Sequence, residues 1–106
     1  MVRKHRTNSE AMEDYFRAWP EDIERYLKGI FEDYAEYGDS AVLLTQLRTV
    51  ARAKGISEMA NEIGMTRQGL QKALSSKGNP RLENVNAIMK AMGYHLVPQK
   101  LDSLNG

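Results

Sequence analysis

The chain has 106 residues, of which 42% are hydrophobic and 27% charged, so it has room for one domain with a modest core. It contains no cysteine, which excludes disulfides and thiolate metal sites. Its apolar runs fall far short of the roughly 20 residues that span a membrane, and none follows the basic N-terminal residues. We therefore expect a cytoplasmic protein without a secretory signal.

Charge is distributed unevenly along the chain. The net charge is only +1, but residues 10–39 hold ten Asp/Glu against three Lys/Arg, which gives −7. Residues 40–100 hold nine Lys/Arg against three Glu, which gives +6. A basic unit follows an acidic one, and this asymmetry indicates that the two parts meet different partners, with nucleic acid favoured for the basic part.

Residues 1–19 are predicted to form a flexible basic and polar extension. Residues 1–8 in particular show no periodicity. They form either a solvated tail or an arm that reaches into the minor groove of DNA.

The Trp19-Pro20 step precedes a predicted amphipathic helix that ends at Gly38. Pro20 suits the first turn of a helix, and apolar side chains then recur at helical spacing from Ile23 to Tyr34. This stripe either packs on the core or contributes a surface for a partner protein or a second copy. The aromatic residues assigned to that interface are Trp19, Tyr26, Phe31 and Tyr34.

A capped helix is predicted next, from Asp39 or Ser40 to about Lys54. Its inner face is apolar and its outer face basic. Gly55 closes it, and Ser57 is predicted to cap a short helix over residues 58–63. The basic outer face carries Arg48, Arg52 and Lys54.

The stretch from 60 to 74 has the outline of a helix-turn-helix. Gly64 ends the short helix, and Thr66 offers a hydroxyl to the free N–H groups of a second helix that runs to about Ser75. Gly69 inside that helix costs about 1 kcal/mol relative to alanine. It therefore indicates the close approach of another helix or of a DNA backbone.

The second helix is predicted to read DNA. Arg67 and Gln68 lie in its first turn and face outward, and arginine reads guanine whereas glutamine reads adenine. Gln71 lies one turn further along the same stripe. Thr66 and Lys72 are suited to phosphate contacts.

Residues 75–80 form a loop rich in hydrogen-bond donors, and its side chains are predicted to position the DNA backbone. Arg81 is expected to add a phosphate contact from the start of the last helix, which runs to residue 92 with Leu82 on its buried face. The loop residues assigned to DNA are Ser75, Ser76, Lys77 and Asn79.

Residues 94–97 are short and β-favouring. They form either an edge strand that pairs with its copy in a dimer or an extended segment that covers the core. Residues 99–106 are expected to fray.

Residues 40–97 resemble the lambda-repressor-like, XRE-type helix-turn-helix domains, above all in the run IGMTRQGL at 63–70. A closer resemblance is to the HigA-like addiction module antidotes, small DNA-binding partners of RelE/ParE-superfamily toxins. It covers roughly residues 20–98 and leaves 1–19 outside. It rests on the runs LRTVARA (47–53), MTRQGLQKALS (65–75) and GNPRL (78–82).

The resemblance implies an all-α, five-helix, lambda-repressor-like domain over residues 20–98, with an N-terminal amphipathic helix and a short C-terminal strand. It also implies a homodimer on palindromic double-stranded operator DNA, a RelE/ParE-like toxin neutralised by the same chain, and repression of its own operon. The alternative is a stand-alone or phage-type repressor without a toxin. A third hypothesis, an interaction module that no longer binds DNA, disagrees with the donor-rich face of the second helix.

No catalytic or metal-binding constellation is predicted, so we expect neither an enzyme nor a cofactor, metal or small-molecule ligand. The two histidines, His5 and His95, are far apart in the sequence, and adjacent acid pairs such as Glu13-Asp14 diverge around a helix.

Overall fold

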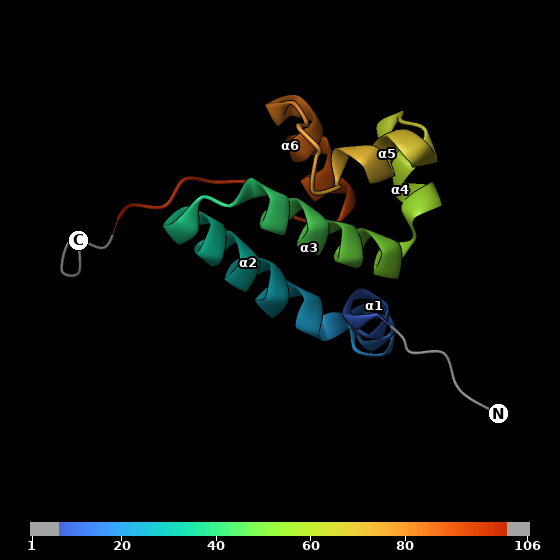
Figure 1. Ribbon diagram of the computed structural model, residues 1–106, viewed down its shortest axis with the longest axis horizontal. Helices are drawn as coiled ribbons and strands as arrows, with labels where there is room; N and C mark the ends of the chain where they lie inside the picture. The colour runs from blue at the N-terminus through green and yellow to red at the C-terminus, as the bar shows by residue number, and fades with distance from the viewer. Residues whose placement is uncertain (1–6, 102–106) are drawn as a thin grey trace.

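A computed structural model of the protein describes residues 7–101 (Figure 1). All regular structure in this range is helical, which confirms the all-α prediction. No helix of the described range is long and apolar enough to cross a bilayer. The elements are α1 (Asn8–Ala18), the short 3₁₀ helix η1 (Pro20–Asp22), α2 (Ile23–Tyr37), α3 (Ser40–Lys54), α4 (Ile56–Ile63), α5 (Arg67–Ala73) and α6 (Leu82–Ala91).

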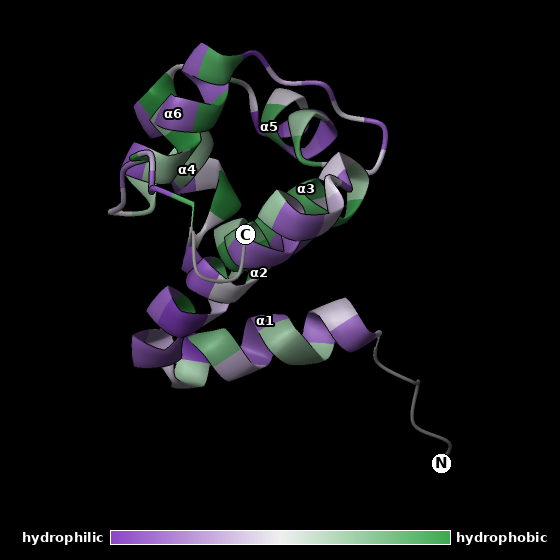
Figure 2. Ribbon diagram, turned by 90° about the vertical axis from the view of Figure 1, so that its left-hand side faces the viewer, coloured by the Kyte–Doolittle hydropathy of each residue, from purple (hydrophilic) through white to green (hydrophobic). Residues whose placement is uncertain are grey.

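Helix α3 lies between two groups of helices. In Figures 1 and 2, α1 and α2 pack on one side of α3, and α4, α5 and α6 lie on the other. Most apolar side chains of α3 are buried, with Val50 and Ala51 at 0% exposure. The core therefore extends from Phe16 in α1 through α3 to Leu70 in α5 and Met89 in α6 as one cluster.

Residues 8–18 form α1, so the prediction of a flexible extension over 1–19 was wrong for these residues. Thr7 and Glu10 form a reciprocal capping box at the start of the helix, with both hydrogen bonds at 3.0 Å. Phe16 anchors the helix to the core at 2% exposure. The predicted DNA-reaching arm covers residues 1–8, of which 1–6 lie outside the described residues.

The helix predicted after Pro20 is present, and Pro20 occupies η1, the 3₁₀ turn before α2. Gly38 ends α2 in the left-handed conformation at φ +69°, where a Cβ would add strain. The Tyr15 hydroxyl donates a hydrogen bond to the Asp22 carboxylate, which links α1 to η1 and raises the pKa of Tyr15 above its ordinary value. The side chains of the stripe that are fully buried are Ile23, Leu27 and Ile30.

Asp39 caps α3, because its carboxylate accepts a hydrogen bond of 3.2 Å from the Val42 amide. Ser57, in contrast, does not cap α4. The chain turns directly from α3 into α4 at Gly55, whose φ of +115° permits the change of direction. The Gly55 carbonyl then accepts from the Met59 amide at 3.1 Å, so the helix has already begun at Ile56.

The C-terminal part differs from the prediction in two ways. Leu82, expected to be buried, is the first residue of α6 and is 77% exposed, whereas Ile88 and Met89 two turns later are buried. Residues 94–97 form no strand; they run as an extended segment beside Leu27 and Phe31 of α2. Residues 99–101 have no regular structure, and the remaining residues of the predicted frayed tail lie outside the described range.

Phe16→Ala should lower the free energy of unfolding by about 3–5 kcal/mol, because it removes a buried ring that joins α1 to the core. Leu82→Ala should change it by less than about 0.5 kcal/mol, because that side chain is exposed. Urea denaturation followed by circular dichroism checks both values. Equal midpoints for Phe16→Ala and the wild type would show that α1 is not part of the cooperative fold.

Candidate nucleic-acid interface

Helices α4 and α5 are joined by a three-residue turn at 64–66. Gly64 adopts φ +76°, and the Met65 amide donates to the Ala60 carbonyl at 2.8 Å, which closes the end of α4. Thr66 then caps α5 by accepting a hydrogen bond of 2.9 Å from the Gly69 amide. The predicted turn and cap are confirmed, although α5 ends at Ala73, two residues earlier than expected.

Gly69 has a local explanation that differs from the predicted one. A Cβ at this position would lie 2.9 Å from the Thr66 Oγ1 atom, closer than such atoms approach one another in proteins. The threonine side chain is short and β-branched, so it cannot move aside without breaking its cap hydrogen bond. Glycine at 69 therefore permits the cap, and no approach by another helix or by DNA is needed to explain it.

The predicted reading face is accessible over the first turn of α5. Thr66, Arg67 and Gln68 are all exposed, and Lys72 is exposed one turn later. The sequence from residue 63 to residue 82 holds four Lys/Arg and no Asp or Glu. The charges that this stretch offers are consequently all positive, and they lie among polar hydrogen-bonding groups, the chemistry that binds phosphates and base edges.

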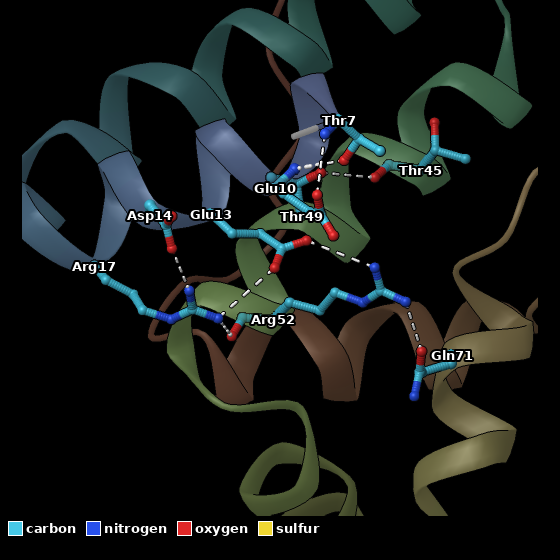
Figure 3. A network of polar contacts seen from close by, with 9 residues as sticks. All are labelled: Thr7, Glu10, Glu13, Asp14, Arg17, Thr45, Thr49, Arg52 and Gln71. Atoms are coloured by element: carbon cyan, nitrogen blue, oxygen red, sulfur yellow. Dashed lines mark hydrogen bonds and ion pairs between the residues drawn. The ribbon is translucent and has the colours of Figure 1, made fainter. Parts of the chain in front are cut away.

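Gln71 is held differently from the other predicted reading residues. It is partly buried, and its Oε1 atom accepts a hydrogen bond of 2.8 Å from Arg52 Nη2 (Figure 3). Arg52 had been predicted on the basic outer face of its helix. It lies instead between α1 and α5, with Nη1 3.6 Å from Glu13 Oε2.

The loop after α5 is packed tightly against the end of that helix. A Cβ at Gly78 would lie 2.1 Å from the Ala73 carbonyl oxygen, so no other residue fits without moving the backbone. Ser75 directs its hydroxyl to the Lys72 carbonyl at 2.8 Å. Ser76, Lys77, Asn79 and Arg81 are exposed, and Arg81 is 4.0 Å from Glu83.

The four aromatic residues predicted to form a partner interface do not share one surface. Tyr26 is partly buried, with its ring 4.7 Å from that of Phe16, and Phe31 packs against the core. Trp19 is 53% exposed and Tyr34 is 40% exposed. Tyr34 instead lies beside Tyr37 and Val42, which are also exposed and which no sequence pattern indicated.

The family described as "probable addiction module antidote protein" matches residues 7–100. The chain belongs to this family. An antidote counteracts a toxin, so membership implies an antitoxin with a toxin partner. The match begins at Thr7 and includes α1, which corrects the expectation that the resemblance starts near residue 20.

A relative of this antidote chain in Haemophilus influenzae (strain KW20/Rd) is described as an uncharacterized protein. It is 35% identical over 80 residues, which cover 76% of this chain and 78% of the relative. No solved structure matches the chain.

Gly69→Ala in the antidote should leave stability unchanged or lower it, because the gain of about 1 kcal/mol in helix propensity is offset by displacement of the Thr66 hydroxyl. Thr66→Ala alone should cost about 1 kcal/mol. In the Thr66→Ala background, Gly69→Ala should stabilise by about 1 kcal/mol. Thermal unfolding of the four proteins measures this coupling; strictly additive effects would exclude it.

Proposed function

We propose that this antitoxin is a HigA-like, sequence-specific DNA-binding protein that represses its own operon and neutralises a RelE/ParE-like toxin. The observation that carries the DNA-binding half is the exposed, exclusively cationic and polar surface of α5 and its following loop. The α4–turn–α5 geometry agrees with an XRE-type helix-turn-helix, in which the N-terminal part of the second helix enters the major groove.

Within this proposal the exposed side chains divide into two roles. Arg67 and Gln68 read base edges from the first turn of α5, and the cap residue Thr66 contacts a phosphate as well. Ser75 shapes the loop, because its hydroxyl donates to the Lys72 carbonyl. The side chains that position the phosphate backbone are Lys72, Ser76, Lys77, Asn79 and Arg81.

The resemblance to lambda-repressor-like domains supports a homodimer on a palindromic operator. A two-fold symmetric pair would present two copies of α5 to half-sites about 34 Å apart, one turn of the DNA helix. Each copy then contributes its own cationic surface, so the dimer doubles the number of phosphates neutralised.

The toxin-binding half of the proposal rests on a groove between the end of α2 and the start of α3. It has a volume of about 280 Å³. The buried side chains of Ile30 and Leu43 line it, and Asp33 and Asp39 stand at its edge. The exposed apolar and aromatic side chains that border it are Tyr34, Tyr37 and Val42.

Charge favours a basic protein over a second copy as the occupant of this groove. Residues 10–39 carry −7, and two copies meeting symmetrically through the groove would oppose their own acids. The carboxylates of Asp33 and Asp39, which line the groove and are exposed, can pair with an arginine or lysine from a toxin.

Arg67→Ala should weaken operator binding by about 1–3 kcal/mol and relax the preference at one base pair. Lys77→Ala should weaken binding to operator and random DNA alike and reduce the salt dependence by about one charge. Lys28→Ala, a charge removal on α2, is the matched control. Fluorescence anisotropy at several salt concentrations measures these effects; equal losses on both DNAs for Arg67→Ala would exclude base reading.

Tyr37→Ala should reduce toxin affinity by about 2 kcal/mol or more while leaving folding intact, because the side chain is 74% exposed. Leu82→Ala, an exposed apolar residue of α6, is the control. Isothermal titration calorimetry measures the dissociation constant of each antitoxin for the small basic protein encoded in the neighbouring reading frame, with the wild type as reference.

Point variants are required, because truncation of residues 1–39 would remove Phe16, Ile23, Leu27 and Ile30 from the core. An unchanged dissociation constant for Tyr37→Ala would exclude the groove, and the absence of any neighbouring toxin would favour the stand-alone repressor.

A further inference from the structure

Three helices meet through one chain of polar contacts that ends at the candidate reading helix (Figure 3). Glu13 of α1 lies 3.6 Å from Arg52 Nη1, and Arg52 of α3 donates through Nη2 to Gln71 of α5. Arg17 of α1 lies 3.7 Å from Glu13 and also donates to the Arg52 carbonyl at 3.2 Å. The Arg52 guanidinium therefore contacts α1 through Nη1 and α5 through Nη2.

The Glu13 carboxylate is buried, with its residue only 8% exposed. Its Oε2 atom accepts no hydrogen bond within the described range, so the charge is compensated by the two nearby guanidinium groups. Burial of an ion pair contributes little net stability, because desolvation of the charges offsets their attraction. An apolar contact between α1 and α3 would hold these helices equally well, and it would leave Gln71 without its partner.

The contact with Arg52 fixes which end of the Gln71 amide faces outward. Arginine carries only donors, so the carbonyl oxygen of Gln71 must be the atom that faces it. The amide nitrogen of Gln71 then points away from Arg52, as Figure 3 shows. Bidentate recognition of adenine requires both the oxygen and the nitrogen of the glutamine amide in one plane toward the base.

We propose that Glu13 and Arg52 are positioning residues that hold Gln71 as a hydrogen-bond donor toward DNA. A donor alone favours guanine, which presents the O6 and N7 acceptors, or thymine, which presents O4, over adenine, whose N7 acceptor lies beside the N6 donor. This inference rests on the proposed DNA binding by α5. It gives Gln71 a more specific role than the base reading that the sequence predicted for it, and it makes α1 part of the DNA-reading apparatus.

The test is selection from a randomised 20-base-pair duplex library with the full-length protein, followed by sequencing of the bound fraction. The wild type should prefer guanine or thymine at the position that depends on Gln71. Gln71→Ala should reduce that preference about tenfold, the equivalent of one good base contact. Arg52→Gln and Glu13→Gln should change the preference at the same position, with adenine gaining.

Matched controls separate positioning from general destabilisation. Glu36→Gln removes an exposed α2 carboxylate outside the network, and Arg48→Gln removes another α3 arginine; neither should change the base profile. Arg52→Lys keeps the positive charge beside Glu13, but lysine has no second nitrogen to bind Gln71 at the same time. This variant therefore remains informative if Arg52→Gln fails to fold. In the Gln71→Ala background, Arg52→Lys should have no further effect at this position.

An unaltered base profile in folded Arg52→Lys and Glu13→Gln would overturn the inference while leaving the proposed function intact. A wild-type preference for adenine at the Gln71-dependent position would do the same. If the wild type enriched no sequence at all, the proposed DNA binding would fail, and the inference would fail with it.

Discussion

The fold depends on one helix that is buried on two opposite sides. At about 100° per residue, Thr49 and Ala51 of α3 project roughly 160° apart, yet both are buried. Ala51 belongs to the apolar face, and Thr49 is compatible with burial because its hydroxyl donates to the Thr45 carbonyl at 3.3 Å. Because both sides of α3 are covered, its width sets the distance between α1 and α2 on one side and α4, α5 and α6 on the other.

Local signals predicted much of this arrangement. Gly38, Gly55 and Gly64 mark helix ends because each adopts a positive φ, and Thr66 is the cap that its residue type suggested. Helix α1 was missed although its signal was present: Thr7 and Glu10 have the spacing of a capping box, and Met12 and Phe16 are one turn apart. The basic residues near the N-terminus suggested a flexible tail. The helix that follows them is stabilised by its packing on α3, which the sequence does not show.

Tertiary contacts account for what the sequence did not predict at the site. Gln71 was assigned to bases from its place on the helix surface, but its partner Arg52 is 19 residues away and is oriented by α1. The aromatic residues of α2 share one stripe, and only the packing of Phe16 distinguishes Tyr26, held in the core, from Tyr34, which is exposed. Periodicity therefore identifies the apolar face of a helix, but the packing of neighbouring helices determines which of its side chains are buried and which are exposed.

The shared core has a consequence for inactivation of the protein by proteolysis. The acidic side with its groove and the cationic side with α5 draw on the same buried cluster, so neither forms an independent folding unit. The exposed link between α2 and α3 at Gly38 and Asp39 joins the two halves. A protease that cut this link would disconnect the helices that carry Phe16, Ile23, Leu27 and Ile30 from α3, so we expect both surfaces to be destabilised together. The proposed toxin capture and the proposed DNA contact would then be lost in a single event with a single rate.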